Sequence, residues 1–212
     1  MPRPRMREQP LSFNDSIAQR RNKLLKFIPD ELLPPIHLLG EWDTLFLSDF
    51  AALHADHLPT LLKMELAETE ETLMGEVISL TRSGRLVAGA NLQWSSGEML
   101  QISRSLLYRA AVQQAQKLGK AAQAERVKPF TAKVWSKKAT LYLHLKYPSP
   151  STVSLARTVE STRGLLEADS AKLVIYHGKP KNLGGLERKF EGLVEAAALE
   201  PLEPQRRRKN KS

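Results

Sequence analysis

The sequence predicts an α+β fold that is mostly helical, with a β-hairpin near residues 76–94 and a C-terminal β-α-β-α unit. Long stretches with apolar residues at three- and four-residue spacing indicate helices, and shorter stretches of alternating apolar and polar residues indicate strands. The chain has 212 residues, 42% of them hydrophobic, and no cysteine, so it can form a sizeable core without disulfides. We expect a single globular domain over residues 11–200, with a sub-boundary near 121–130.

The N-terminal part is expected to be a flexible basic arm followed by three helices. Residues 1–10 contain two Pro-Arg pairs and no apolar period, which is typical of a flexible arm. A helix over 14–28 would end at Pro29, because proline cannot continue a helix. Aromatic and apolar residues at helical spacing then predict a core helix over 41–56, and Pro59 permits a further helix to about Leu73.

Strands are expected from the middle of the chain onwards. Alternating apolar residues over 86–94, preceded by Ser83-Gly84 at a turn, predict the hairpin. The rest alternates strand and helix: a strand over 137–147, a helix over 150–168, a strand over 172–178 and a last helix around 186–197. Such a unit favours parallel strand pairing with a right-handed crossover. Residues 201–212 are expected to be a disordered basic tail.

Charge is distributed very unevenly along the chain. The net charge is +9 and the isoelectric point is about 9.8. Residues 101–147 contain ten Lys or Arg and one acid, whereas residues 41–76 contain nine acids and one Lys. A segment this basic is typical of nucleic-acid-binding proteins, and the acidic segment would suit a protein partner. The alternatives are a solubilising surface, or a basic face covered by the chain's own acidic segment.

One segment of the basic region, "GEMLQISRSLLYRAA", predicts a function more directly. Its apolar residues, with Ser95 and Glu98 at capping-box spacing, resemble the helix-turn-helix of bacterial DNA-binding proteins over residues 93–112. The resemblance implies a turn at 101–103, a dimer, and a recognition helix in the major groove of DNA. The other interpretation is one continuous amphipathic helix over 97–118.

A second nucleic-acid hypothesis depends on residues 130–147, where aromatic residues alternate with lysines. Aromatic faces beside cations suit RNA or single-stranded nucleic acid, whose bases stack; the alternative is a half-buried strand with lysines in water. Together, the two hypotheses and the basic tail predict these contact residues: Arg104, Ser105, Tyr108, Arg109, Lys117, Lys120, Lys133, Trp135, Lys137, Lys138, Tyr142, Lys146, Arg206, Arg207 and Arg208.

A third hypothesis concerns the Gly-rich loop in "IYHGKPKNLGGLERKF". Backbone N–H groups at a helix start can hold a phosphate, and the candidate residues are Lys179, Lys181, Gly184 and Gly185. A solvated connection is the alternative. This site would suit a small-molecule enzyme, although no catalytic motif is present and His54 and His57 lack a further zinc ligand.

We therefore expect a non-enzymatic, cytoplasmic DNA-binding regulator or accessory factor without a cofactor. An RNA or single-strand binder, and a protein adaptor or small-molecule enzyme, are the alternatives.

Overall fold

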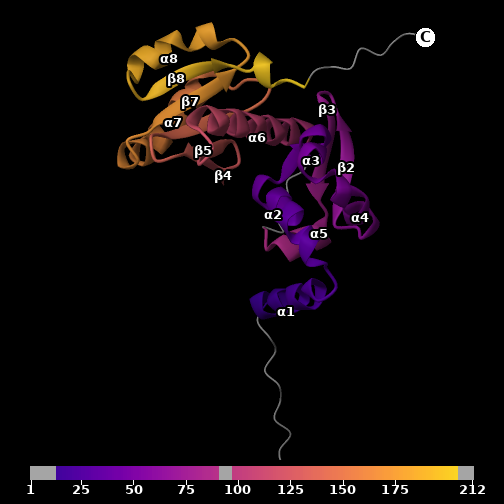
Figure 1. Cartoon of the computed structure of the whole chain (residues 1–212). Coiled ribbons are helices and arrows are strands. Elements are labelled where there is room, and N and C mark those ends of the chain that lie inside the picture. Colours follow the sequence, from indigo (N-terminus) through magenta and orange to yellow (C-terminus); the bar gives the residue numbers. More distant parts are fainter. Residues whose placement is uncertain (1–12, 91–96, 205–212) are drawn as a thin grey trace, which may run out of the picture.

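Two β-sheets joined by one long helix make up the computed structural model, which describes residues 13–90 and 97–204, with side chains from Ser16 onwards. Helix α6 (Glu98–Leu118) runs from the N-terminal half into the C-terminal half (Figure 1). The α+β class predicted from the sequence is confirmed. Within the described ranges, no helix combines the length and apolar character needed to cross a membrane.

The N-terminal half packs short helices around a three-stranded antiparallel sheet of order β1-β3-β2. Its elements are α1 (Phe13–Leu25), α2 (Leu33–Trp42), β1 (Thr44–Phe46), α3 (Leu47–His54), α4 (Leu58–Lys63), β2 (Ala67–Thr72), β3 (Gly75–Leu80) and α5 (Arg82–Ala88). Three-residue 3-10 helices at Asp30–Leu32 and Ala55–His57 precede α2 and α4.

The prediction of one helix over 41–56 is wrong, because the chain changes direction at Asp43. This residue has φ 66° and ψ −45°, outside the helical region, and it separates α2 from β1. The buried aromatic residues of the segment lie in three different elements: Trp42 in α2, Phe46 in β1 and Phe50 in α3. The next predicted helix is also too long, since α4 ends at Lys63 and β2 follows.

The predicted hairpin near 76–94 is displaced toward the N-terminus. The hairpin consists of β2 and β3, and residues 82–88 form α5. The Thr81 side chain caps α5 by accepting a hydrogen bond from the Gly84 backbone N–H, and Gly89, at φ 69°, ends the helix. The apolar alternation over 86–90 therefore occurs in a helix and its end, and residues 91–96 lie outside the described part of the chain.

The C-terminal half is a five-stranded sheet between helices. Its elements after α6 are β4 (Gln123–Lys128), β5 (Thr131–Trp135), β6 (Thr140–Leu145), α7 (Thr152–Ala168), β7 (Lys172–His177), α8 (Gly184–Lys189) and β8 (Val194–Ala198). Strands β4, β5 and β6 are antiparallel neighbours, whereas β6, β7 and β8 are parallel neighbours. The predicted β-α-β-α unit is present with its parallel pairing. The last predicted helix is too long, because Gly192 at φ 78° lies in the connection from α8 to β8.

Two cores lie on opposite faces of this sheet. Leu143 and Leu145 belong to the core that also contains Ile102 and Leu106 of α6, whereas Tyr142 packs with Leu155 of α7. The first core continues into the N-terminal half, so both halves share it.

The predicted sub-boundary near 121–130 is occupied by strand β4. Residues 201 and 202, which the sequence assigned to the basic tail, belong to a 3-10 helix (Glu200–Leu202) that packs on α6, where Leu202 is 1% exposed.

Candidate nucleic-acid interface

Helix α6 is one unbroken helix, so the structure has no turn at residues 101–103. The Ser103 hydroxyl donates to the Met99 carbonyl oxygen and accepts a hydrogen bond from the Tyr147 backbone N–H at 2.9 Å. These bonds hold the proposed turn position in the helix and against the end of β6. Of the two interpretations of this segment, the structure has the continuous helix.

The four residues expected on a recognition helix all make internal contacts. Arg104 and Ser105 are buried, and the Tyr108 ring packs edge-on against Trp42 with centroids 5.2 Å apart. Burial raises the pKa of Tyr108, and the charges of Asp49 and Glu41 add to this shift. Arg109 binds both oxygens of the Asp49 carboxylate at 2.6 and 2.8 Å. None of these four side chains is available for a DNA groove in this structure.

Two residues of the second nucleic-acid hypothesis, Tyr142 and Lys133, also make internal contacts. Tyr142 is 3% exposed, and its hydroxyl donates to Asp169 Oδ2 at 2.7 Å. Lys133 Nζ lies 2.6 Å from the same oxygen, and it also lies over the rings of Trp135 and Tyr142. The lysine hydrogen bond, followed by that from Tyr142, lowers the pKa of Asp169. Tyr142 therefore cannot stack a base, and the charge of Lys133 is already paired.

Four other predicted lysines, Lys117, Lys120, Lys137 and Lys138, are exposed at one end of the five-stranded sheet. This is the amino end of β6 and β7, because Lys137 and Lys138 lie between β5 and β6. We call these four residues the amino-end lysines. Arg206, Arg207 and Arg208 lie outside the described residues.

The opposite, carboxyl end of the sheet brings together two segments that the sequence hypotheses had kept apart. Because β6 and β7 are parallel, with Leu145 paired to Tyr176, Lys146 after β6 and Lys179 after β7 leave the sheet at the same end. The Gly178 backbone N–H donates to Ser149 Oγ at 3.1 Å and ties the two segments directly.

The turn between β4 and β5 adds a third segment to this end. Lys128 pairs with Thr131, which pairs with His144 near the end of β6. We call the four exposed lysines Lys128, Lys146, Lys179 and Lys181 the basic rim. The three segments that carry them, 127–131, 144–152 and 177–183, contain no Asp or Glu.

The electrostatics of the basic rim favour anions. Helix α7, 17 residues long, begins there after its cap Ser151, so the positive end of its dipole faces the same side. Lys146 Nζ lies 5.2 Å from the centre of the Phe130 ring. Burial lowers the pKa of His144 to about 4, and the nearby charges of Lys146 and Lys128 contribute to this shift. Ligands of open α/β sheets bind at the carboxyl ends of parallel strands, where this rim lies.

The four candidate phosphate-binding residues lie in two different parts of the structure. Lys179 and Lys181 belong to the basic rim, and Gly184 and Gly185 are the first two residues of α8. Sequence reasoning missed Lys128, whose position depends on strand register. The parallel β6-α7-β7 pairing was the available signal that Lys146 and Lys179 would meet.

The remaining candidate residues are acids on β2 and two neighbouring histidines. Glu68, Glu70 and Glu71 are exposed on β2. His54 and His57 have ring centroids 6.0 Å apart. Across the described ranges, no group of three or more His, Cys, Asp or Glu could hold a metal ion.

Comparisons of the chain with protein-family models, with curated proteins and with solved structures found no match.

Proposed function

We propose that this protein binds nucleic acid, without catalysing a reaction, by contacting phosphates at the basic rim. The observation that carries the proposal is that four exposed lysines from three separate segments converge at one end of a sheet, in segments without a carboxylate. Lysines at such a position neutralise backbone phosphates and release condensed counterions.

The mode of binding follows from which side chains are accessible. Because the recognition-helix residues are buried or paired, base reading by α6 is not part of the proposal. Phosphate contacts fix the position of a protein on nucleic acid but do not read its sequence. We therefore expect little sequence preference on duplex DNA. Phe130 is half-buried beside Lys146, and we expect an unpaired base to stack on its ring.

Two variants with equal charge change test the proposal. The rim variant replaces Lys128, Lys146, Lys179 and Lys181 by Gln, and the control replaces the four amino-end lysines by Gln. Each lost phosphate contact reduces the slope of log affinity against log salt by about 0.9 on duplex DNA, so the rim variant should lose up to about 3.6. The control should lose clearly less.

The measurement is fluorescence anisotropy with labelled duplex DNA, single-stranded DNA and structured RNA at several salt concentrations. Equal losses in the two variants would show that net charge, and not the rim, drives binding. Binding of a mononucleotide as tight as that of an oligonucleotide would instead favour the small-molecule site. The tail arginines Arg206, Arg207 and Arg208 belong to the same proposal: deletion of residues 205–212 should weaken all sequences alike.

A second candidate function has its own observation. Strand β2 is at the edge of its sheet, and the exposed acids Glu68, Glu70 and Glu71 lie along it. An edge strand can pair with an extended peptide, and these acids would favour a basic one. A synthetic Lys/Arg-rich peptide should bind the wild-type protein and lose affinity when the three acids are replaced by Gln. Unchanged affinity would remove this candidate.

A further inference from the structure

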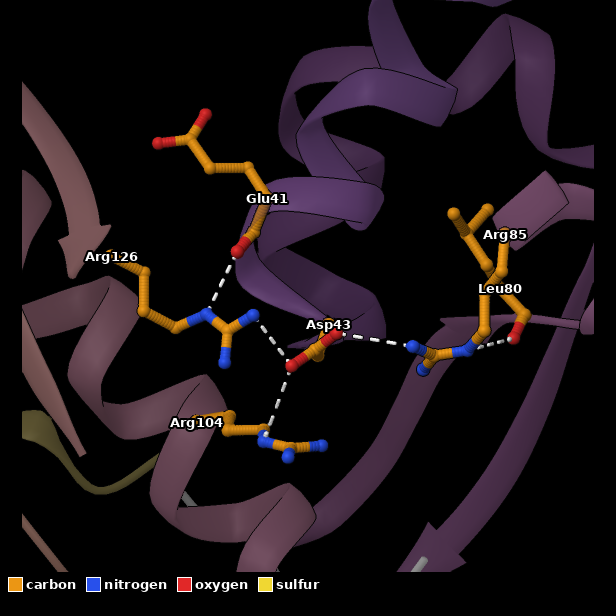
Figure 2. Close-up of polar contacts among 6 residues, drawn as sticks. All are labelled: Glu41, Asp43, Leu80, Arg85, Arg104 and Arg126. Atoms are coloured by element: carbon orange, nitrogen blue, oxygen red, sulfur yellow. Dashed lines mark hydrogen bonds and ion pairs between the residues drawn. The ribbon is translucent and has the colours of Figure 1, made fainter. Parts of the chain in front are cut away.

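Away from the basic rim, three arginines surround one carboxylate where α2, α5, α6 and β4 meet (Figure 2). Asp43 Oδ1 lies 3.1 Å from Arg85 Nη1. Asp43 Oδ2 lies 2.6 Å from Arg126 Nη2 and 3.6 Å from Arg104 Nε. All four side chains are largely shielded from water, and that of Arg104 is only 7% exposed.

The arginines of this cluster differ in their hydrogen bonds. Arg85 Nε donates to the Leu80 carbonyl oxygen, and Arg126 Nε donates to that of Glu41 at 2.8 Å. Among the described residues, Arg104 Nε and Nη1 are buried and have no hydrogen-bond partner. Arg104 thus has two buried donors that no other described residue satisfies.

The charges around Arg104 also indicate that a negative group is missing there. Burial lowers its pKa, and although Asp43 opposes this shift, Arg126 and Arg85 add to it. Among the described side chains, one carboxylate lies within ion-pair distance of these three guanidinium groups, which leaves two positive charges in excess. The nearby Glu41 does not offset them at Arg104, because its side chain extends away from the cluster in Figure 2. A buried charge without full compensation is strongly unfavourable, so a further negative group is expected.

The chemistry of Arg104 indicates what that group is. The guanidinium has parallel N–H donors that match two oxygens of one oxyanion. A macromolecule cannot reach a side chain that is 7% exposed, so the expected ligand is a small ion. Asp43, in an unfavourable backbone conformation at φ 66°, holds the centre of the cluster, and strained residues concentrate at ligand sites.

We propose that the Asp43–Arg85–Arg104–Arg126 cluster binds a small free oxyanion of the phosphate class, with Arg104 as its main ligand. The site differs from the basic rim and does not depend on nucleic-acid binding. Because Asp43 and Arg85 belong to the N-terminal half and Arg126 to the five-stranded sheet, a bound anion would strengthen the junction of the two halves.

Thermal unfolding in inorganic phosphate and in sodium chloride of equal ionic strength tests this site. A ligand that binds only the folded state raises the melting temperature with its concentration. We expect phosphate to raise it by several degrees more than chloride does. Isothermal titration should give one phosphate per chain. Arg104→Met should abolish both effects, and Arg104→Lys, which keeps the charge but loses the paired donors, should reduce them.

The rim variant is the matched control, because it removes exposed cations but leaves Arg104 unchanged. It should keep the phosphate effect even if it loses nucleic acid, so the two proposals can fail separately. Equal shifts in phosphate and chloride would overturn the anion site. So would a phosphate shift that persists in folded Arg104→Met protein, one that is undiminished in folded Arg104→Lys protein, or one that disappears in the rim variant.

Discussion

His144, beneath the basic rim, should make the stability of the protein depend on pH. The residue is 7% exposed, and its Nδ1 lies 3.2 Å from Thr131 Oγ1. Burial, with repulsion from Lys146 and Lys128, lowers its pKa to about 4 in the folded state. The unfolded chain has an ordinary histidine pKa of about 6.5. As pH falls from 6.5 to 4, the unfolded chain therefore binds a proton that the folded protein does not.

The free energy of unfolding should consequently fall across this pH window and lose nothing more from His144 below it. Each unit of pKa difference corresponds to about 1.4 kcal/mol, so His144 contributes a total loss of about 3 kcal/mol. Urea unfolding at pH 7.5 and pH 4.5 measures most of it. His144→Gln removes the titrating group and should make the pH dependence shallower by roughly 2.5 kcal/mol over this interval.

The contribution of the nearby Lys146 charge to the pKa of His144 can be tested with a matched pair of substitutions. Lys146→Gln removes a charge near His144 and should raise the histidine pKa measured by NMR titration. Lys138→Gln removes an exposed charge at the other end of the sheet and should leave it unchanged. If wild type and His144→Gln lose equal stability between the two pH values, or if His144 titrates near pH 6.5, the burial argument is refuted.

Four further substitutions follow from packing, ion pairs and hydrogen bonds. Gly84→Ala should destabilise the protein by about 1–3 kcal/mol in urea unfolding, because a Cβ there would overlap the Leu66 carbonyl oxygen; Gly164→Ala, in an open position of α7, should instead stabilise it by about 0.5–1 kcal/mol. If both substitutions change the free energy of unfolding in the same direction, the close contact at Gly84 is contradicted. Asp43→Ala should lower the free energy of unfolding by about 3–5 kcal/mol, since it removes the carboxylate beside buried arginines; a loss below 1 kcal/mol would contradict the cluster's role. Ser103→Ala should cost about 1–2 kcal/mol through its two hydrogen bonds, and an unchanged denaturation midpoint would show that neither bond contributes.

The C-terminal half was largely predictable because its local patterns and its packing agree. Alternating leucines place β6 correctly, and Leu155, Val159 and Leu166, spaced for one helix face, are fully buried in α7. The helix begins at Thr152, two residues later than predicted, because Ser151 caps it by accepting a hydrogen bond from the Ser154 backbone N–H. A strand, a capped helix and a second apolar strand leave few ways to pair, and the parallel arrangement follows.

The N-terminal half was less predictable because single residues there override the apolar period. The helical spacing of apolar residues through Phe46 and Phe50 continues across Asp43, although the backbone leaves the helical conformation at this residue. Gly84 permits α5 to lie against the Leu66 carbonyl oxygen, and no local sequence pattern predicts this contact.

The candidate site was predicted only in part, since summed charge does not show which cations are paired. Arg109 belongs to the basic segment, but its partner Asp49 lies 60 residues earlier. Lys133 is likewise neutralised by Asp169, which follows α7. The helix-turn-helix resemblance failed to identify accessible residues for the same reason: periodicity does not reveal that both faces of α6 are covered.

Position-specific crosslinking tests most directly whether nucleic acid lies on the basic rim. A photoreactive residue is placed at Lys146 in one protein and at Lys138 in another, and each is irradiated with the same labelled oligonucleotide at low salt. Binding at the basic rim should give a strong crosslink from position 146 that declines with salt, and little from position 138. A crosslink that is equal at both positions, or stronger at 138, would contradict it.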